Sequence, residues 1–438
     1  MKHRLLLLLP CLTAWLWLAC GQGPLAGGST SETEAAVYGY IRMPSGDAAS
    51  GAHVIIRSSA YLVGSTEFTD FNRDTVTDAN GFFKVKDMAI GKYVVEITHG
   101  DSLGLALTSE IGSKRNPKID TVLSPLGAVT AFVQTNDTNE YSMEVYGIER
   151  QSKVDDNGDL RTPLPVGTFK LQISSDQITQ APLVFSNVEV IPNRDTLLGM
   201  VKLPSNANGE IGYWNFEESD SSILDQSPTG LNGKLGGAQR VAGKIGRALS
   251  FAHPAVVDLG IPQPDVFDFG AEQDFTMAAW IKIASPLPFN GDSQRILSKQ
   301  QLSGRAYLLR TLPDGTAAIS VRTAMSEANA FDQKGKSVVT DGKWHHIAGR
   351  RQQGWLTIFV DGKSEGSRFA DSVFRAGDYV PPFSAHYSGN SELKNAAHNR
   401  LFIGGHFLGE QTVDGDIDEV HIYRRALTSQ ELQALANP

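Results

Sequence analysis

From residue 36 onwards, the sequence is a series of short runs in which apolar and polar residues alternate, separated by Gly, Pro, Asn and Asp. Residues 75–85 and 91–97 are two such runs. A period of two is typical of β-strands that bury one face. Between strands, residues 78–81 predict a hairpin turn, because Asn80 and Gly81 tolerate positive φ. The pattern therefore predicts an all-β chain built from sandwiches.

Length and composition limit the remaining possibilities. With 438 residues, the chain is long enough for two to four domains. The charged fraction of 20% and the hydrophobic fraction of 41% are ordinary for folded proteins and exclude wholesale disorder or a collagen-like chain. The net charge is −9 and no long basic run occurs, which excludes nucleic acid as an expected partner.

The first residues have the layout of an export signal. Lys2, His3 and Arg4 precede an apolar stretch at residues 5–18. As a helix, these 14 residues would extend only about 21 Å, against a hydrocarbon core of ~30 Å. The stretch is therefore interpreted as a signal peptide and not as a membrane-spanning helix.

The end of this stretch, Leu16-Trp17-Leu18-Ala19-Cys20, resembles the lipobox of bacterial lipoproteins, although Trp17 departs from the usual aliphatic residue. The resemblance implies a signal peptide at residues 1–19, acyl chains on Cys20 and a membrane partner through this lipid anchor. No Asp follows Cys20, which implies the outer membrane of the bacterial cell envelope. Gly-rich residues 20–35 would form a flexible linker. The alternative is a plain secretory signal peptide; Cys11 and Cys20 are the chain's only cysteines.

Residues 36–124 resemble a carboxypeptidase-regulatory-like, transthyretin-type β-sandwich, through the segments at 51–54, 77–82 and 91–93. In that family the module is usually a stalk or spacer. A fainter copy follows, because residues 156–158 and 165–173 echo 80–81 and 90–97. Residues 125–203 are therefore predicted to form a second, divergent sandwich. Its acidic segment at 155–159 lacks the span of an EF-hand, so a solvated turn is favoured over a calcium loop.

Residues 209–435 carry an ordered set of motifs at 212–218, 246–251, 275–282, 341–348, 356–363, 401–405, 415–423 and 425–432. In this order they resemble the LamG-like, concanavalin A-like jelly-roll family, which predicts two packed antiparallel sheets over residues 209–438. Thr428 and Glu431 have the spacing of a helix capping box. The large apolar residues of the motifs are expected to point into the core between the sheets: Trp214, Phe216, Trp280, Ile347, Phe359 and Ile422.

This domain offers two kinds of candidate acidic site. A glycosidase family on the same fold uses Glu-x-Asp-x-x-Glu, but here Asp416 replaces the first Glu and His421 the last. Retaining hydrolysis needs two carboxyl groups in distinct roles, so we expect no enzyme. The family resemblance also implies one structural Ca²⁺, for which the acidic residues inside the motifs are the candidate ligands: Glu217, Asp225, Asp416 and Asp418. Solvated carboxylates are the alternative.

A long connection supplies the candidate ligand site. Residues 364–399, between Lys363 and Arg400, number 36, and connections beyond about 15 residues are usually functional or disordered. The segment is rich in aromatic residues, and sugars pack their C–H faces on aromatic rings. The residues expected to bind a glycan are Tyr379, Phe383, Tyr387 and Asn390. The alternative is that the aromatic rings pin the loop to the sandwich.

Together these patterns predict two small β-sandwiches followed by a concanavalin A-like jelly roll, held at a cell envelope by lipid. The expected function is non-catalytic recognition, with a polysaccharide or glycan as partner. A structural or protein–protein adhesion module is the second interpretation, and a glycoside hydrolase is the third.

Overall fold

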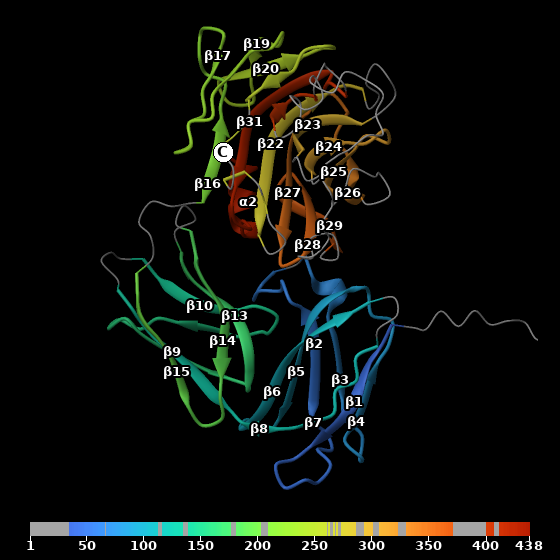
Figure 1. Ribbon diagram of the computed structural model, residues 1–438, viewed down its shortest axis with the longest axis vertical. Helices are drawn as coiled ribbons and strands as arrows, with labels where there is room; N and C mark the ends of the chain where they lie inside the picture. The colour runs from blue at the N-terminus through green and yellow to red at the C-terminus, as the bar shows by residue number, and fades with distance from the viewer. Residues whose placement is uncertain are drawn as a thin grey trace, which may run out of the picture. The chain divides into compact units, whose positions relative to one another are not determined.

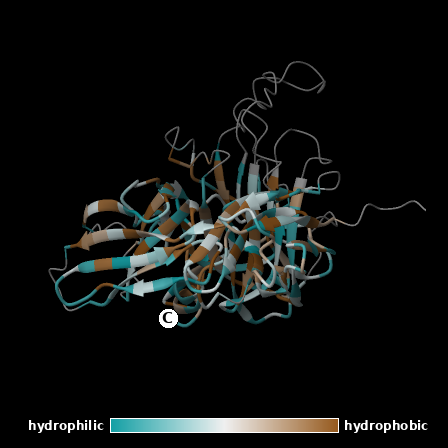
Figure 2. Ribbon diagram, turned by 90° about the horizontal axis from the view of Figure 1, so that it is seen from below, coloured by the Kyte–Doolittle hydropathy of each residue, from teal (hydrophilic) through white to brown (hydrophobic). Residues whose placement is uncertain are grey.

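The computed structural model describes residues 35–65, 67–112, 116–134, 139–176, 181–202, 209–260, 262, 266–267, 269, 273–285, 293–300, 306–322, 330–370, 400–406 and 411–438. Ala35–Pro438 forms one compact unit, in which nearly every described element is a β-strand (Figure 1). The all-β prediction is confirmed. Hydrophobic and hydrophilic residues alternate along many of the strands (Figure 2). No helix among the described residues is long and apolar enough to cross a membrane.

The first sandwich has two sheets around an apolar core. Strand β1 (Val37–Arg42) lies at the centre of one sheet, antiparallel to β4 (Phe82–Val85) and parallel to β7 (Thr121–Val122). The other sheet has the order β3-β2-β5-β6-β8, with the bounds Arg73–Val76, His53–Ser58, Gly91–His99, Leu103–Ile111 and Ser124–Pro125.

The second sandwich repeats this strand order, except that none of its described strands corresponds to β8. Strand β9 (Gly127–Val133) is antiparallel to β12 (Asp159–Leu164) and parallel to β15 (Asp195–Val201). The facing sheet has the order β11-β10-β13-β14, with the bounds Gln151–Lys153, Tyr141–Val145, Gly167–Ser175 and Leu183–Val190. The two modules therefore share one topology.

The same turn also occurs in both modules. Asp78 Oδ1 accepts the backbone N–H groups of Asn80 and Phe82 at 2.8 and 2.9 Å. In the second copy, Asp155 Oδ1 accepts those of Asn157 and Asp159 at 2.9 and 2.8 Å. The prediction of a hairpin at residues 78–81 is wrong, because β3 and β4 belong to different sheets. The turn instead crosses between the two layers, and its Asp satisfies the backbone donors that the crossing leaves unpaired.

The jelly roll consists of two eight-stranded antiparallel sheets. The β31 sheet has the order β19-β20-β31-β22-β27-β28-β29, and β16 (Glu210–Trp214) also pairs with β31. In that order, the bounds of the seven strands are Gln239–Ala242, Arg247–Phe251, Gly415–Tyr423, Phe275–Ile283, Trp344–Gln352, Trp355–Val360 and Lys363–Phe369. The β23 sheet has the order β17-β18-β21-β30-β23-β24-β25-β26; its bounds are Ser222–Ile223, Gly233–Lys234, Val257–Asp258, Leu401–Ile403, Gln294–Gln300, Ala306–Thr311, Thr316–Arg322 and Ala330–Val338.

The core between these sheets contains most of the expected residues, including Trp214, Phe216, Ile347 and Ile422. Two others are buried on the opposite face of the β31 sheet, so their predicted orientation is wrong. Phe359 packs under helix α2 (Ser429–Leu435) with Leu427 and Leu432. Trp280 contacts His346, and the Lys244 ammonium lies 4.4 Å from its ring centroid. These residues belong to strands buried on both faces, where alternation does not show which face meets the core.

The helix begins as predicted. The Thr428 hydroxyl accepts the Glu431 N–H, and the Glu431 carboxylate accepts the Thr428 N–H at 2.7 Å. Asp361 and Gly362, both at positive φ, form the two-residue hairpin between β28 and β29.

The jelly roll and the first sandwich share an apolar core. Trp355 of β28 is fully buried among four aromatic rings, with centroids 4.6–5.9 Å away: Phe68, Phe71, Tyr93 and Phe369. Phe71 ends the short 3₁₀ helix η1 (Thr69–Phe71). Phe369, which the sequence places in a long loop, is the last residue of strand β29. The first sandwich thus packs directly on the jelly roll.

Candidate functional site

A β-bulge in the final strand brings two consecutive carboxylates to one face of the β31 sheet. The register of β31 on β22 shifts between Asp418 and His421, and Glu419 has a φ of 48°. Ile417 and Val420, on either side of the bulge, both point into the jelly-roll core. Asp418 and Glu419 therefore both lie on the outer face, as bulges commonly arrange for polar side chains.

These carboxylates belong to a polar group that we name the β31 network: Glu210, Tyr213, Asp418, Glu419 and His421. The Tyr213 hydroxyl donates to Glu419 Oε2 at 2.7 Å, and His421 Nδ1 lies 2.7 Å from Glu210 Oε1. The Tyr213 and His421 rings stack with centroids 4.3 Å apart. Burial alone would lower the pKa of His421, but the contacts with Glu210 and Glu419 outweigh it and raise that pKa.

Asp418 is the most enclosed member of the network. Its side chain is fully buried and accepts the backbone N–H groups of Ile245 and Glu419 at 3.0 and 2.9 Å. Burial raises the pKa of Asp418 to about 7. Glu419 is only 8% exposed. Both carboxylates are thus held in contacts within the protein.

The four candidate calcium ligands have separate roles. Asp225 accepts three hydrogen bonds within its own turn, from Ser227 N, Thr229 Oγ1 and Leu231 N, and a fourth from Tyr213 N of β16. Glu217 accepts the Arg247 N–H at 2.8 Å, and Asp416 lies 3.5 Å from Lys282 Nζ. Within the described ranges, no three His, Cys, Asp or Glu residues are grouped to hold a metal ion. The calcium site stays a prediction.

The other sequence candidates lie outside the described residues. These are Cys20 and the four aromatic and amide residues of the long connection, Tyr379, Phe383, Tyr387 and Asn390.

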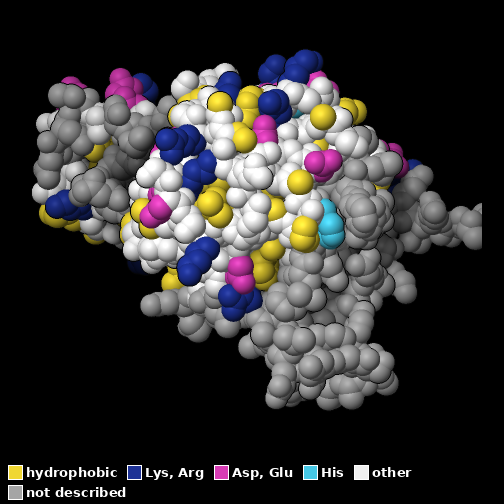
Figure 3. Space-filling model, turned by 90° about the horizontal axis from the view of Figure 1, so that it is seen from above, with side chains coloured by type: hydrophobic (Ala, Val, Ile, Leu, Met, Phe, Trp, Pro, Cys, Tyr) yellow, Lys and Arg dark blue, Asp and Glu magenta, His cyan; other side chains and the backbone are white. Residues whose placement is uncertain are grey.

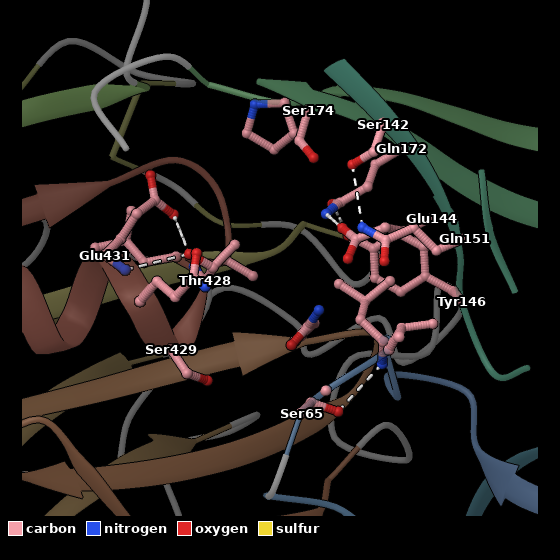
Figure 4. A pocket seen from close by; sticks show the side chains of 18 of the residues that line it. Ser65, Ser142, Glu144, Tyr146, Gln151, Gln172, Ser174, Thr428, Ser429 and Glu431 are labelled. Atoms are coloured by element: carbon pink, nitrogen blue, oxygen red, sulfur yellow. Dashed lines mark hydrogen bonds between the residues drawn. The ribbon is translucent and has the colours of Figure 1, made fainter. Parts of the chain in front are cut away.

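A cavity of about 490 Å³ lies where the three modules meet, and we name it the junction cavity (Figure 4). Its floor is the outer face of the sheet β11-β10-β13-β14, which contributes Ser142, Glu144, Gln172 and Ser174. The walls are supplied by residues 426–431, which include the start of α2, and by residues 60–65 and 67–68 of the first sandwich.

Polar side chains on the floor are joined by hydrogen bonds. The Tyr146 hydroxyl donates to Gln172 Oε1 at 2.7 Å, and Gln172 Nε2 donates to Glu144 Oε2 at 2.8 Å. Gln151 Nε2 donates to the Ser142 hydroxyl at 3.2 Å. Burial raises the pKa of Glu144.

Sequence reasoning missed this cavity. The polar residues on β10 and β13 alternate with core residues, and this pattern also fits a solvent-facing surface. The sequence signal for the cavity is weak: Ser142, Gln172 and Ser174 carry hydroxyl and amide side chains, and none of these three positions is a Lys.

Two packed antiparallel sheets with this strand order define a jelly roll. Residues 259–433 match the model of the "Concanavalin A-like lectin/glucanases superfamily". The C-terminal domain is a concanavalin A-like domain, as the motifs predict. Comparison with curated proteins gives no match.

Among solved structures, the chain is similar to the binding domain of Paraclostridial mosquitocidal protein 1, with 14% identity, TM-score 0.39 and 52% of each chain covered. It is also similar to domain 4 of AbnA, a GH43 extracellular arabinanase from Geobacillus stearothermophilus, in complex with arabinotriose. This match has 18% identity and a TM-score of 0.37, and it covers 52% of this chain and 98% of that one. The binding domain of botulinum neurotoxin DC, in complex with rat synaptotagmin II, has 12% identity, TM-score 0.37 and coverage of 52% and 51%. The match spans about half the length of the two toxin chains.

Cations do not gather into one patch on the face shown in Figure 3, where Lys and Arg side chains are scattered among acidic and apolar ones.

Proposed function

We propose that this chain is a non-catalytic carbohydrate-recognition protein. The lectin/glucanase family match over residues 259–433 supports a carbohydrate partner. The state of the β31 network favours binding over hydrolysis, and this observation carries the proposal. In the segment nearest to a glycosidase motif, Asp418 and its neighbour Glu419 are buried and hydrogen-bonded within the protein, and His421 stands in place of the last Glu. A retaining glycosidase needs two carboxyl groups about 5 Å apart that both reach the sugar.

The second part of the proposal concerns location. Cys20 would carry the acyl chains, and residues 20–35 would tether the folded unit to the bacterial outer membrane. Two or three chains are enough for stable anchoring, whereas a single acyl chain binds a membrane only marginally. Recognition would then take place at the cell surface.

A glycan array probed with the full chain tests the binding proposal. Selective retention of particular glycans is expected, with no release of reducing ends during prolonged incubation. Failure to retain any glycan would contradict carbohydrate recognition. Release of reducing ends by the native chain and its loss in Glu419→Gln would instead identify a hydrolase.

A further inference from the structure

We infer that the junction cavity is a second ligand site, built for a neutral, hydroxyl-rich molecule such as one or two sugar units of a neutral glycan. The cavity lies on the second sandwich and its neighbours, and its lining shares no residue with the β31 network. The choice of a sugar rests on the proposed function, whereas the position and charge preference of the site rest on the cavity itself.

The size of the junction cavity suits a small ligand. Binding pockets for small molecules are typically ~300–1,000 Å³, and this cavity is about 490 Å³. It is lined by segments that are distant in sequence, at residues 60–65, 67–68, 140–153, 172–176 and 426–431. Groups from several elements therefore converge on one space.

The floor is arranged in advance for hydrogen bonding. Gln172 is 2% exposed, and its amide is fixed at both atoms, because the Tyr146 hydroxyl donates to its oxygen and its nitrogen donates to Glu144. Flipping the amide would place its oxygen against the Glu144 carboxylate and lose that hydrogen bond. A ligand therefore meets an ordered set of groups and does not have to order them, which favours affinity. Carboxylates, amides and hydroxyls are suitable partners for sugar hydroxyl groups.

The charges around the junction cavity select against anions. Its lining includes five carboxylates and two cations: Glu67, Glu140, Glu144, Asp176 and Glu431 against Lys153 and Arg350. Both cations are already paired, Arg350 with Glu67 and Lys153 with Glu140. Glu144 accepts its hydrogen bond from a neutral amide. A uronate, sulfate or phosphate group would lie close to these carboxylates, which outnumber the cations of the lining, and both cations already have a carboxylate partner.

The test compares binding of defined oligosaccharides to the full chain and to variants. The probes are neutral cello-, xylo-, manno- and arabino-oligosaccharides, with oligogalacturonate as the acidic counterpart, measured by titration calorimetry. Ser174→Trp places an indole in the junction cavity. Thr130→Trp introduces the same indole at a partly exposed position on β9, in the other sheet of the same sandwich, and is the matched control.

We expect at least one neutral probe to bind the native chain, with affinity falling at least tenfold in Ser174→Trp and unchanged in Thr130→Trp. Oligogalacturonate should not bind. If Ser174→Trp does not fold, as judged by circular dichroism, the near-isosteric Glu144→Gln replaces it and should also weaken binding.

Two results would overturn the inference while leaving the proposed function intact: equal affinity in the native and cavity variants, or preference for oligogalacturonate. Absence of binding to every probe and to every arrayed glycan would overturn both.

Discussion

Glu67 of the first sandwich and Arg350 of strand β27 form an ion pair of 3.3 Å between side chains that are only 1% and 3% exposed. The same guanidinium donates to the Leu427 carbonyl at 2.9 Å, and the Ser429 hydroxyl donates to Glu67 Oε1. One buried pair thus joins the first sandwich, the β31 sheet and the start of α2. Removing one partner of a buried pair leaves an uncompensated charge.

Arg350→Met is therefore expected to lower the free energy of unfolding by about 3–5 kcal/mol. Adding Glu67→Leu removes the orphaned carboxylate and should restore part of that loss. Urea unfolding of the full chain measures both variants. A loss below about 1 kcal/mol in Arg350→Met would place the pair among weak surface contacts.

The pKa of Asp418 gives stability a defined dependence on pH. Because burial raises this pKa to about 7, the folded state binds a proton that the unfolded state has already released. The contribution of Asp418 to the free energy of unfolding therefore falls as pH rises from about 4 to about 7, and stays low above that.

Asp418→Asn should make the free energy of unfolding depend less on pH over this range. The variant is therefore expected to gain stability relative to the native chain as pH rises from 5 to 8. Unfolding free energies at several pH values provide the comparison. His421 and His346 titrate in both proteins, so the difference between the two curves isolates Asp418. A difference independent of pH would contradict a raised pKa.

Trp355→Ala tests the shared core. Truncating a fully buried Trp costs about 3–5 kcal/mol, and here the loss should destabilise the first sandwich and the jelly roll together. A single cooperative transition, shifted to lower denaturant, is the expected outcome. Trp344→Ala, at a partly buried position on β27, is the control and should cost less. Separate transitions for the two modules in the native chain would contradict coupling through Trp355.

The paired turns predict equal effects in the two sandwiches. Asp78→Ala and Asp155→Ala each remove an acceptor for two backbone N–H groups, and each should cost about 0.5–2 kcal/mol. Asp156→Ala, at an exposed neighbouring position, should stay within about 0.5 kcal/mol of the native chain. Thermal unfolding distinguishes them. A large calcium-dependent loss confined to Asp155→Ala would mean that the second turn binds the ion.

The lipid anchor depends on a single side chain. Cys20→Ser should release the protein from membranes and abolish labelling by radioactive fatty acid, since a serine hydroxyl cannot replace the thiol in lipoprotein processing. Fractionation of cells expressing each form is the measurement. Equal membrane retention of the variant would rule out anchoring at Cys20.

Local chemistry could be predicted from the sequence, whereas long-range packing could not. The Thr428–Glu431 capping box depends on a few adjacent residues, and it occurs as expected. Trp280 and Phe359 were assigned to the wrong side of their sheet, because the alternation that indicates a buried face is lost when both faces are covered. The junction cavity needs residues from three modules at once, and nothing in the local pattern of β10 or β13 shows that another module covers it.

The bulge at Glu419 divides strand β31 into two halves of opposite parity. Before it, odd-numbered Ile417 points to the core, and after it the even-numbered Val420 and Ile422 do so. If the same residues formed a regular strand without the bulge, the downstream half would turn over, driving His421 and Tyr423 into the apolar core and Val420 out of it. The bulge thus shifts the alternation of side chains between the two faces by one residue. A single strand can then direct Ile417, Val420 and Ile422 to the core and Asp418, Glu419 and His421 to the outer face.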